Sequence, residues 1–146
     1  MSPQVATALG SHLGKLSCIQ HLDLSDNRFG ADGIKLLGPH LSLLASIQQL
    51  NLSNNEIGAD GAESLGPYLA QLTSVKQLDL SENLVGDYGA ETLGPHLPHL
   101  ASIQQFHFRN NKVGVNGVLS LGPHLAQLTC IQQLSLIHIS EPTRPY

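Results

Sequence analysis

Histidine is the residue of this chain whose number and spacing most suggest chemistry. Four of the eight histidines, His12, His40, His96 and His124, share one place in a regular 28-residue period, and Tyr68 fills the remaining place. Neutral imidazole is a common metal ligand. Equivalent positions on neighbouring helices lie about 8–10 Å apart, however, which is too far for two ligands that each bind one zinc ion at about 2.0–2.1 Å. We therefore expect solvated surface histidines, and we predict neither a metal nor a cofactor.

Carboxylates and thiols follow the same spacing. Asp23 and Asp79 lie two periods apart. If each period adds one strand to a parallel sheet, their carboxylates are about 9–10 Å apart, which favours a solvated polar column over an acid–base pair. Cys18 and Cys130 lie four periods apart. A disulfide requires Cα atoms within about 7 Å, so we expect two free thiols.

The composition limits the class of protein. The 146 residues are 41% hydrophobic and 12% charged, with a net charge of -4 and seven lysines and arginines. Such a chain is long enough and apolar enough for one folded domain. It carries no basic patch for nucleic acid, no apolar run of about 18–20 residues and no signal peptide in "MSPQVATALG". We predict a cytoplasmic protein that binds neither nucleic acid nor a membrane.

A strict internal repeat organises the chain. One isoleucine or valine marks each period, at Ile19, Ile47, Val75, Ile103 and Ile131. The unit "IQxLDLSxNxxGxDGxxxLGPHLxxLxS" is complete at 19–46, 47–74, 75–102 and 103–130. Its back half also occupies 5–18. A period of this length is typical of solenoids, in which each unit stacks on the next.

The spacing of the hydrophobic residues changes halfway through each unit. Leu22 and Leu24 alternate as in a short strand, whereas Leu37, Leu41 and Leu44 are spaced as on one face of a helix. Recurring glycines between the two patterns indicate backbone with positive φ or close approach. We expect side-chain caps at the helix starts from Asp32, Asp60 and Asn116. At the proline of each "LGPH" we expect a kinked helix in preference to two short ones.

A strand, a crossover helix and a parallel strand in succession predict an α/β solenoid with right-handed connections. Strands stack about 4.8 Å apart, whereas packed helices need about 8–10 Å. The solenoid must therefore curve into a horseshoe, with the parallel sheet on the concave face and the helices on the convex face.

The stretch "IQQLNLSNNEIGADGAESL" resembles the leucine-rich repeat of the ribonuclease-inhibitor type, seen in ribonuclease inhibitor, Ran GTPase-activating protein and NOD-like receptors. Its "LxxLxLxxN" core is met by Ile19, Leu22, Leu24 and Asn27, and by the matching residues of the next three units. The resemblance implies a structural ladder of side chains bonded to backbone, formed by Asn27, Asn55, Asn83 and Asn111.

The fourth unit departs from the repeat. "FHFRNN" replaces "LDLSDN", which puts Phe106 and Phe108 at core positions and His107 and Arg109 beside them. Arginine and exposed apolar groups are enriched at binding surfaces. Drift near a repeat end is the alternative explanation. The candidate partner-binding residues, on the concave face and in the fourth unit, are His107, Arg109, Gln105, Asp79, Glu82 and Leu119.

The expected function is a protein–protein interaction module that is not an enzyme. A rigid scaffold with many surface side chains suits recognition, and it provides no catalytic pocket. The resemblance implies a fragment of a larger intracellular protein, such as a NOD-like receptor or a related regulator, with another protein as partner. It also implies an alternative, a GTPase-activating module like Ran GTPase-activating protein, although no catalytic residue carries over. The near-constant glutamines of the concave face leave a spacer array of low specificity as a third hypothesis.

The last residues leave the repeat. We divide the chain into a partial N-terminal repeat (1–18), a repeat array (19–134) and a tail (135–146). Ile139 stands where the ladder asparagine belongs, and Pro142 stands where a glycine belongs. The string "LSLIHISEPTR" resembles the frame translation of a sequencing adapter, and such segments are excluded from fold reasoning. We expect a tail that is not native sequence and has no order of its own, and a functional tail motif is the alternative.

Overall fold

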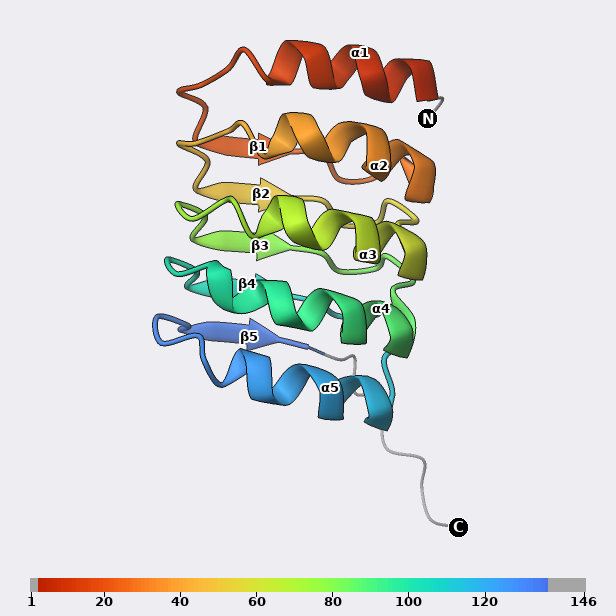
Figure 1. The fold of residues 1–146 in the computed structure, drawn as a ribbon, viewed down its shortest axis with the longest axis vertical. Helices are drawn as coiled ribbons and strands as arrows, with labels where there is room; N and C mark the ends of the chain where they lie inside the picture. Colours follow the sequence, from red (N-terminus) through yellow and green to blue (C-terminus); the bar gives the residue numbers. More distant parts are fainter. Residues whose placement is uncertain (1–2, 137–146) are drawn as a thin grey trace.

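Strands and helices alternate along residues 3–136, which are the residues described by the computed structural model (Figure 1). The strands are β1 (His21–Asp23), β2 (Gln49–Asn51), β3 (Gln77–Asp79), β4 (Gln105–His107) and β5 (Gln133–Ser135). The helices are α1 (Pro3–Leu13), α2 (Gly30–Leu41), α3 (Gly58–Leu69), α4 (Gly86–Leu93), α5 (Val115–Leu125) and the 3-10 helix η1 (Gly94–His99). Each strand therefore has a helix before it and, up to β4, a helix after it.

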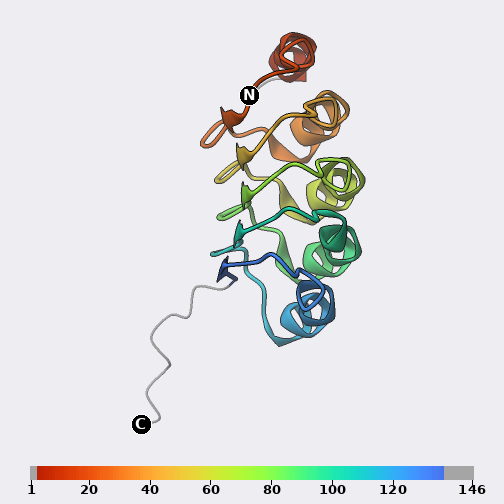
Figure 2. The same ribbon diagram turned by 90° about the vertical axis from the view of Figure 1, so that its left-hand side faces the viewer.

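The strands form one parallel sheet in the order β1-β2-β3-β4-β5. Every pairing joins equivalent residues of consecutive units, as in Leu22 with Leu50 and Leu50 with Leu78. The strands line the inner side of the stack and the helices its outer side, with a gentle curve toward the strands (Figure 2). The predicted α/β solenoid is confirmed, because strands and helices occupy opposite layers in sequence order.

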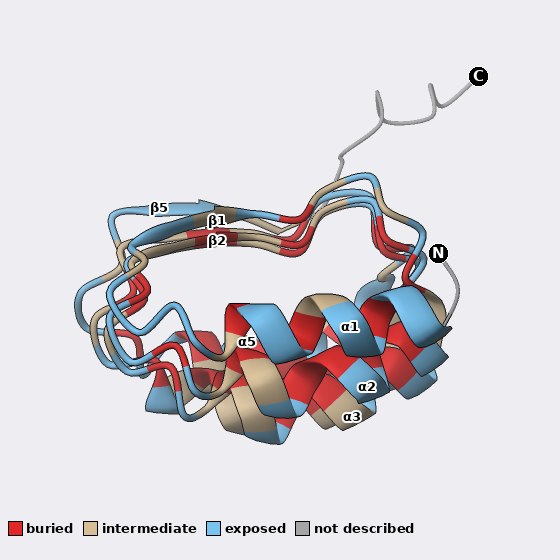
Figure 3. Ribbon diagram, turned by 90° about the horizontal axis from the view of Figure 1, so that it is seen from above, coloured by how far each residue is buried: buried red, intermediate tan, exposed pale blue. Residues whose placement is uncertain are grey.

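The hydrophobic core fills the space between the two layers. Buried residues face each other from the sheet and the helices, while the outer helix faces are exposed (Figure 3). Leu37, Leu41 and Leu44, predicted to share one helical face, are all buried. Leu50 and Leu52 are buried on the strand side. One core continues through every unit, so each unit depends on its neighbours for burial.

The asparagines connect adjacent units through buried hydrogen bonds. The backbone N–H groups of Asn27, Asn55 and Asn83 each donate to the Oδ1 atom of the asparagine one unit further on, at 2.9, 2.7 and 2.8 Å. The Nδ2 group of Asn55 donates to the carbonyl oxygens of Leu24 and Leu52, at 2.9 and 3.0 Å. Each buried amide thereby satisfies backbone groups of two units, which is how a polar side chain can lie inside an apolar core.

The glycines between strand and helix serve two different purposes. Gly58 has a φ of 70°, a left-handed conformation that side chains disfavour. Gly61 is needed for close approach, because a Cβ atom there would lie 2.6 Å from the Ile57 Cγ2 atom and 3.2 Å from the Ala31 Cα atom. Each repeat thus brings its helix close against the helix of the preceding unit.

The predicted side-chain caps at Asp32, Asp60 and Asn116 are wrong. The helices begin earlier, and the residues at their N-caps make no side-chain capping bonds. Instead the N–H groups of Gly30 and Gly58 each donate at 2.8 Å to the backbone carbonyl of the ladder asparagine in the next unit. The acceptor comes from a neighbouring unit and not from the local sequence, so a local capping rule misses it.

The start of α5 is satisfied in a different way. The Oδ1 atom of Asp87, in the preceding unit, accepts from the N–H groups of Gly114 and Gly117, at 2.7 and 3.1 Å. Gly114 has a φ of -103° instead of a positive value. Asp87 therefore provides an acceptor from the preceding unit, whereas the starts of α2 and α3 use an asparagine carbonyl from the next unit.

The prolines do not interrupt most of the helices. Pro39, Pro67 and Pro123 lie inside continuous helices and not between two short ones, and they are exposed. In the third unit the expectation of one kinked helix is wrong, because α4 ends at Leu93 and a 3-10 helix follows. Pro98 explains the difference, because the residue at its place in the other units donates its N–H to the glycine carbonyl four residues earlier, and proline has no N–H.

The predicted boundary between array and tail lies inside a strand. Ser135 belongs to β5 and pairs with His107 of β4. Leu136 packs against the core. The rest of the predicted tail, residues 137–146, lies outside the described residues.

Candidate functional site

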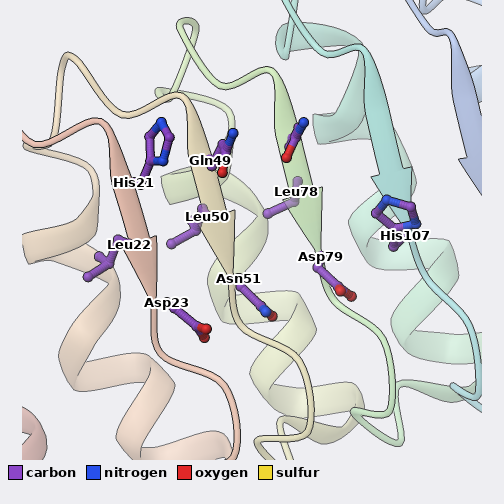
Figure 4. A pocket seen from close by; sticks show the side chains of 10 residues that line it. His21, Leu22, Asp23, Gln49, Leu50, Asn51, Leu78, Asp79 and His107 are labelled. Carbon is purple, nitrogen blue, oxygen red and sulfur yellow. The ribbon is translucent and has the colours of Figure 1, made fainter.

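The concave face consists of polar side chains at alternate positions of each strand. In β1, β2 and β3 the central leucines, Leu22, Leu50 and Leu78, point toward the core, and the labelled residues on either side point out (Figure 4). One outward column contains His21, Gln49, Gln77, Gln105 and Gln133. The other contains Asp23, Asn51, Asp79, His107 and Ser135. The face is therefore rich in hydrogen-bonding groups and poor in net charge.

The second column is held in place by local hydrogen bonds. The Oδ1 atoms of Asp23, Asn51 and Asp79 each accept from the backbone N–H of the serine two residues later, at 2.9 Å. The Ser25 hydroxyl also donates to Asp23, at 2.6 Å, and these two bonds from Ser25 lower the pKa of the Asp23 carboxyl, the hydroxyl having the larger effect. The carboxylates thus stabilise the turns after the strands, as a polar column would.

Two open hollows lie on this face. The first, of about 350 Å³, lies over β1, β2 and β3 (Figure 4). It is lined by His21, Leu22, Asp23, Gln49, Leu50, Asn51, Gln77, Leu78, Asp79 and His107. The second, of about 490 Å³, lies beside it toward β5. It is lined by Asp79, Ser81, Glu82, His107, Arg109, Asn110, Gln133 and Ser135. Asp79 and His107 border both hollows.

Four of the six candidate residues meet at the second hollow. Asp79 and His107 are register partners on neighbouring strands. The Glu82 N–H donates to the Arg109 carbonyl oxygen at 2.8 Å, and the Arg109 N–H donates to the Ser81 hydroxyl at 3.1 Å. Two acidic side chains, one imidazole and one guanidinium therefore border the same open surface. Such a mixture of charges suits a polar protein interface.

The other two candidates lie elsewhere. Gln105 lies in the first column, between Gln77 and Gln133, and does not line the second hollow. Leu119 lies on α5, on the helical side of the stack, where 68% of its surface is exposed. The sequence grouped Leu119 with Arg109 because both depart from the repeat consensus, but strand and helix positions of one unit lie on opposite faces.

The two phenylalanines of the fourth unit lie in the core. Phe106 and Phe108 are both buried, and their rings stack with centroids 5.6 Å apart and an angle of 21° between planes. This agrees with the prediction that they replace core leucines. The rings anchor β4 and the turn after it, so that His107 and Arg109 project from a rigid base.

The histidines of the helices are not simply solvated. His40, Tyr68, His96 and His124 are half-buried, and each ring covers the glycine at one equivalent repeat position of the preceding unit. A Cβ atom added to Gly10, Gly38 or Gly66 would lie 2.4 Å from the covering ring, and one added to Gly94 would lie 2.8 Å away. The expectation of solvated histidines is therefore wrong for the internal units. The rings join adjacent helices.

Several lining residues were not predicted. Gln133 and Ser135 border the second hollow, although they belong to the unit whose pattern fails soon afterwards. Ser81 and Asn110 match the repeat consensus and so gave no signal as single residues. Only the strand register, which places these positions one unit apart, could have indicated them.

The described part of the chain offers few other chemical sites. Within residues 3–136, no cluster of three histidine, cysteine, aspartate or glutamate side chains could hold a metal ion. Cys18 and Cys130 are exposed free thiols. No helix among these residues combines the length and apolar character needed to span a bilayer.

Comparisons with known proteins agree with the repeat pattern. The sequence model of the family described as "Leucine Rich repeat" matches residues 15–38, 44–66 and 71–94. No curated protein sequence matches the chain. Among solved structures, the fold is similar to a Caenorhabditis elegans structure titled as the tropomodulin C-terminal domain, with a TM-score of 0.75, 12% identity, and coverage of 97% of this chain and 86% of that one. Three stretches of the chain therefore match leucine-rich repeats, and the fold is an α/β solenoid.

Proposed function

We propose that this chain is a protein-binding module that contacts its partner through the second hollow of the concave face. The proposal depends mainly on one observation: Asp79, Glu82, His107 and Arg109 border a single open surface on a rigid sheet. Leucine-rich repeats in general mediate protein–protein contacts, and the repeat match supports the same role here.

The off-pattern residues are the basis for the test. His107→Asp and Arg109→Ser restore the residue types that other units carry at these positions. Both side chains lie outside the core, so the double variant should fold normally. Interface arginines often contribute about 2 kcal/mol, so we expect affinity for the partner to fall roughly thirtyfold. The partner would be identified with a photoreactive group at position 107, and its affinity measured by calorimetry.

A matched control lies on the opposite face. Leu119→Glu also restores the consensus type, but at an exposed position of α5. We expect it to leave partner affinity unchanged. Unchanged affinity in the double variant, with the fold intact, would instead favour sequence drift in the fourth unit.

Finer hypotheses depend on the family resemblance alone. We propose the ribonuclease-inhibitor type of repeat, and a role as part of a cytoplasmic regulator such as a NOD-like receptor, as the first of them. The GTPase-activating alternative requires that the chain accelerate GTP hydrolysis by a small GTPase. A spacer array would show no crosslinked partner at all.

A further inference from the structure

The charged side chains of the repeat array are divided along the stack. Residues 19–102 contain ten acidic and three basic side chains. Residues 103–130, the fourth unit, contain Arg109 and Lys112 and no aspartate or glutamate. The first three units and the fourth unit therefore differ in the sign of their net charge. Because the potentials of separate charges add, a charged segment near the stack is attracted to different units according to its own sign.

The change of sign crosses the concave face between β3 and β4. Asp79 of β3 and His107 of β4 are register partners. Asp23 belongs to the same column as Asp79, two strands away on the acidic side. Arg109 lies on the other side of the boundary, in the fourth unit. Since Asp79 and His107 border both hollows, one segment that occupied the two hollows would contact carboxylates at one end and basic side chains at the other.

The carboxylates of the acidic side are held in place and have an oxygen left for a partner. Within residues 3–136, the hydrogen bonds that Asp23 and Asp79 accept are all made by their Oδ1 atoms, from Ser25 and Ser81. The Oδ2 atoms can therefore accept from an ammonium or guanidinium group. A side chain that is already ordered loses less conformational entropy when it binds a partner, which favours these two positions as contacts.

The spacing of the strands favours a helical segment. Neighbouring strands lie about 4.8 Å apart, and one turn of an α-helix advances about 5.4 Å. Side chains one turn apart would therefore meet successive strands. Over the four intervals from β1 to β5 the mismatch reaches roughly 2–3 Å, which long charged side chains can span. In an extended segment, side chains on one face repeat about every 6.7 Å and lose register with the strands sooner.

From these observations we propose that the partner docks a helical segment across the strands of the concave face, with its basic end over β1, β2 and β3 and its acidic end over β4. Lysine or arginine side chains of this segment meet Asp23 and Asp79, and its carboxylates meet His107 and Arg109. This inference rests on the proposed function and adds the charge order of the partner to it. Such complementarity fixes the direction in which the segment binds.

The test uses the full chain and a synthetic helical peptide as the probe. The distance from β1 to β5 is about 19 Å, which about 13 residues of helix can span. The peptide carries three glutamates in its first half, where the helix dipole favours them, and three lysines on the same face of its second half. A hydrocarbon staple on the opposite face is needed, because so short a helix is marginal in water. A nitroxide label is placed at either end.

The label should report the direction of binding by NMR. We expect the label at the lysine end to broaden the backbone amide signals of β1 and β2 more than those of β4, and the label at the glutamate end to do the reverse. A control peptide of the same composition, with lysines and glutamates alternating along its face, has the same net charge. It should bind roughly threefold more weakly or worse, because about half of its ion pairs are lost.

Matched variants of the protein test the acidic side. We expect Asp23→Asn or Asp79→Asn to weaken binding of the peptide roughly twofold to fivefold, as for an exposed ion pair. Both variants keep the Oδ1 acceptor, as Asn51 shows at the equivalent position, so the turns should stay intact. Asp32→Asn makes the same change of charge at an exposed position of α2, on the outer side of the stack, and should leave binding unchanged.

The outcomes distinguish this inference from the proposed function. Absence of binding, a label effect in the opposite direction, or equal effects of Asp23→Asn and Asp32→Asn would overturn the charge order. The proposed function is tested separately, by the affinity of the captured partner for the His107→Asp and Arg109→Ser double variant. If that affinity falls while the label shows no preferred direction, the second hollow binds the partner but the charge order is wrong.

Discussion

At the scale of single residues, the ring-on-glycine contact couples stability to pH. His96 covers Gly66 in the preceding helix. Burial lowers the pKa of His96 below its ordinary value, and the nearby His99 lowers it further. The contact therefore favours the neutral imidazole. In another unit the same position is occupied by Tyr68, whose side chain takes up no proton on acidification.

The sign of the pH effect follows from this shift. The unfolded chain binds a proton at His96 near pH 6.5, and the folded chain binds it only at lower pH. The contribution of His96 to stability is thus complete above about pH 6.5 and declines as the pH falls through the lower, folded value. We expect His96→Tyr to reduce the loss of unfolding free energy between about pH 7.5 and about pH 5.5, measured by urea denaturation.

A control separates this contact from general acid effects. His12→Tyr changes the equivalent but exposed position at the N-terminal end of the described chain. It should leave the pH dependence of the wild-type chain unchanged. If His96→Tyr and the wild-type chain lose stability equally on acidification, the contact does not couple to protonation.

At the scale of secondary-structure elements, α5 depends on one side chain from another unit. Asp87 accepts from Gly114 and Gly117 at the start of this helix. We expect Asp87→Ala to lower the free energy of unfolding by about 1 kcal/mol, the usual cost of a lost N-cap. Asp87→Asn, which keeps the acceptor oxygen, should lose less. Equal stability of the alanine variant and the wild-type chain in chemical denaturation would show that the bonds are not stabilising.

The elements were predictable where the information is local. The spacing of Leu37 and Leu41 reports the helix directly, whereas Leu44, predicted to continue it, lies beyond its end. The alternation ending at Leu24 reports the strand. The caps were not predictable, because the acceptor for Gly30 is the carbonyl of Asn55 in the next unit. The 3-10 helix results from the missing N–H of Pro98. The repeat consensus does not show this substitution, because the other units have no proline at this position.

The candidate site was predictable to a similar extent. Asp79, Glu82, His107 and Arg109 were identified from the repeat and do border one hollow. Leu119 was grouped with them only because it departs from the consensus. The sequence shows which residues differ from the repeat consensus. Whether two of these residues can contact the same partner depends on whether both lie on the strand side or both on the helix side of the stack.

At the scale of the whole molecule, the contribution of a ladder asparagine to stability should depend on the position of its unit in the stack. The Asn83 side chain bonds groups in two units: its Oδ1 accepts from the Asn55 N–H, and its Nδ2 donates to the carbonyls of Leu52 and Leu80. The Nδ2 bonds of Asn27 go to Leu24 and Ser25, within its own unit. The central asparagine therefore supports a junction that the first one does not.

Two alanine variants test this difference. Asn83→Ala leaves several buried backbone groups without partners, so we expect a loss of about 3 kcal/mol or more. Asn27→Ala removes only local bonds near the end of the stack, so we expect about 1 kcal/mol. Urea denaturation of both variants measures the contrast. Equal losses would mean that the bonds between units contribute no more than those within a unit.

The constant strand register also determines which insertions and deletions the fold tolerates during evolution. Deleting residues 47–74 joins Ser46 to Val75 and leaves Asn83 one period after Asn27, so strand partners and ladder bonds stay in phase. A deletion that is not a whole number of repeats moves side chains that belong in the core to the surface. Recombination between units can therefore lengthen or shorten the concave surface by whole repeats, and each intermediate in that lineage remains a folded protein.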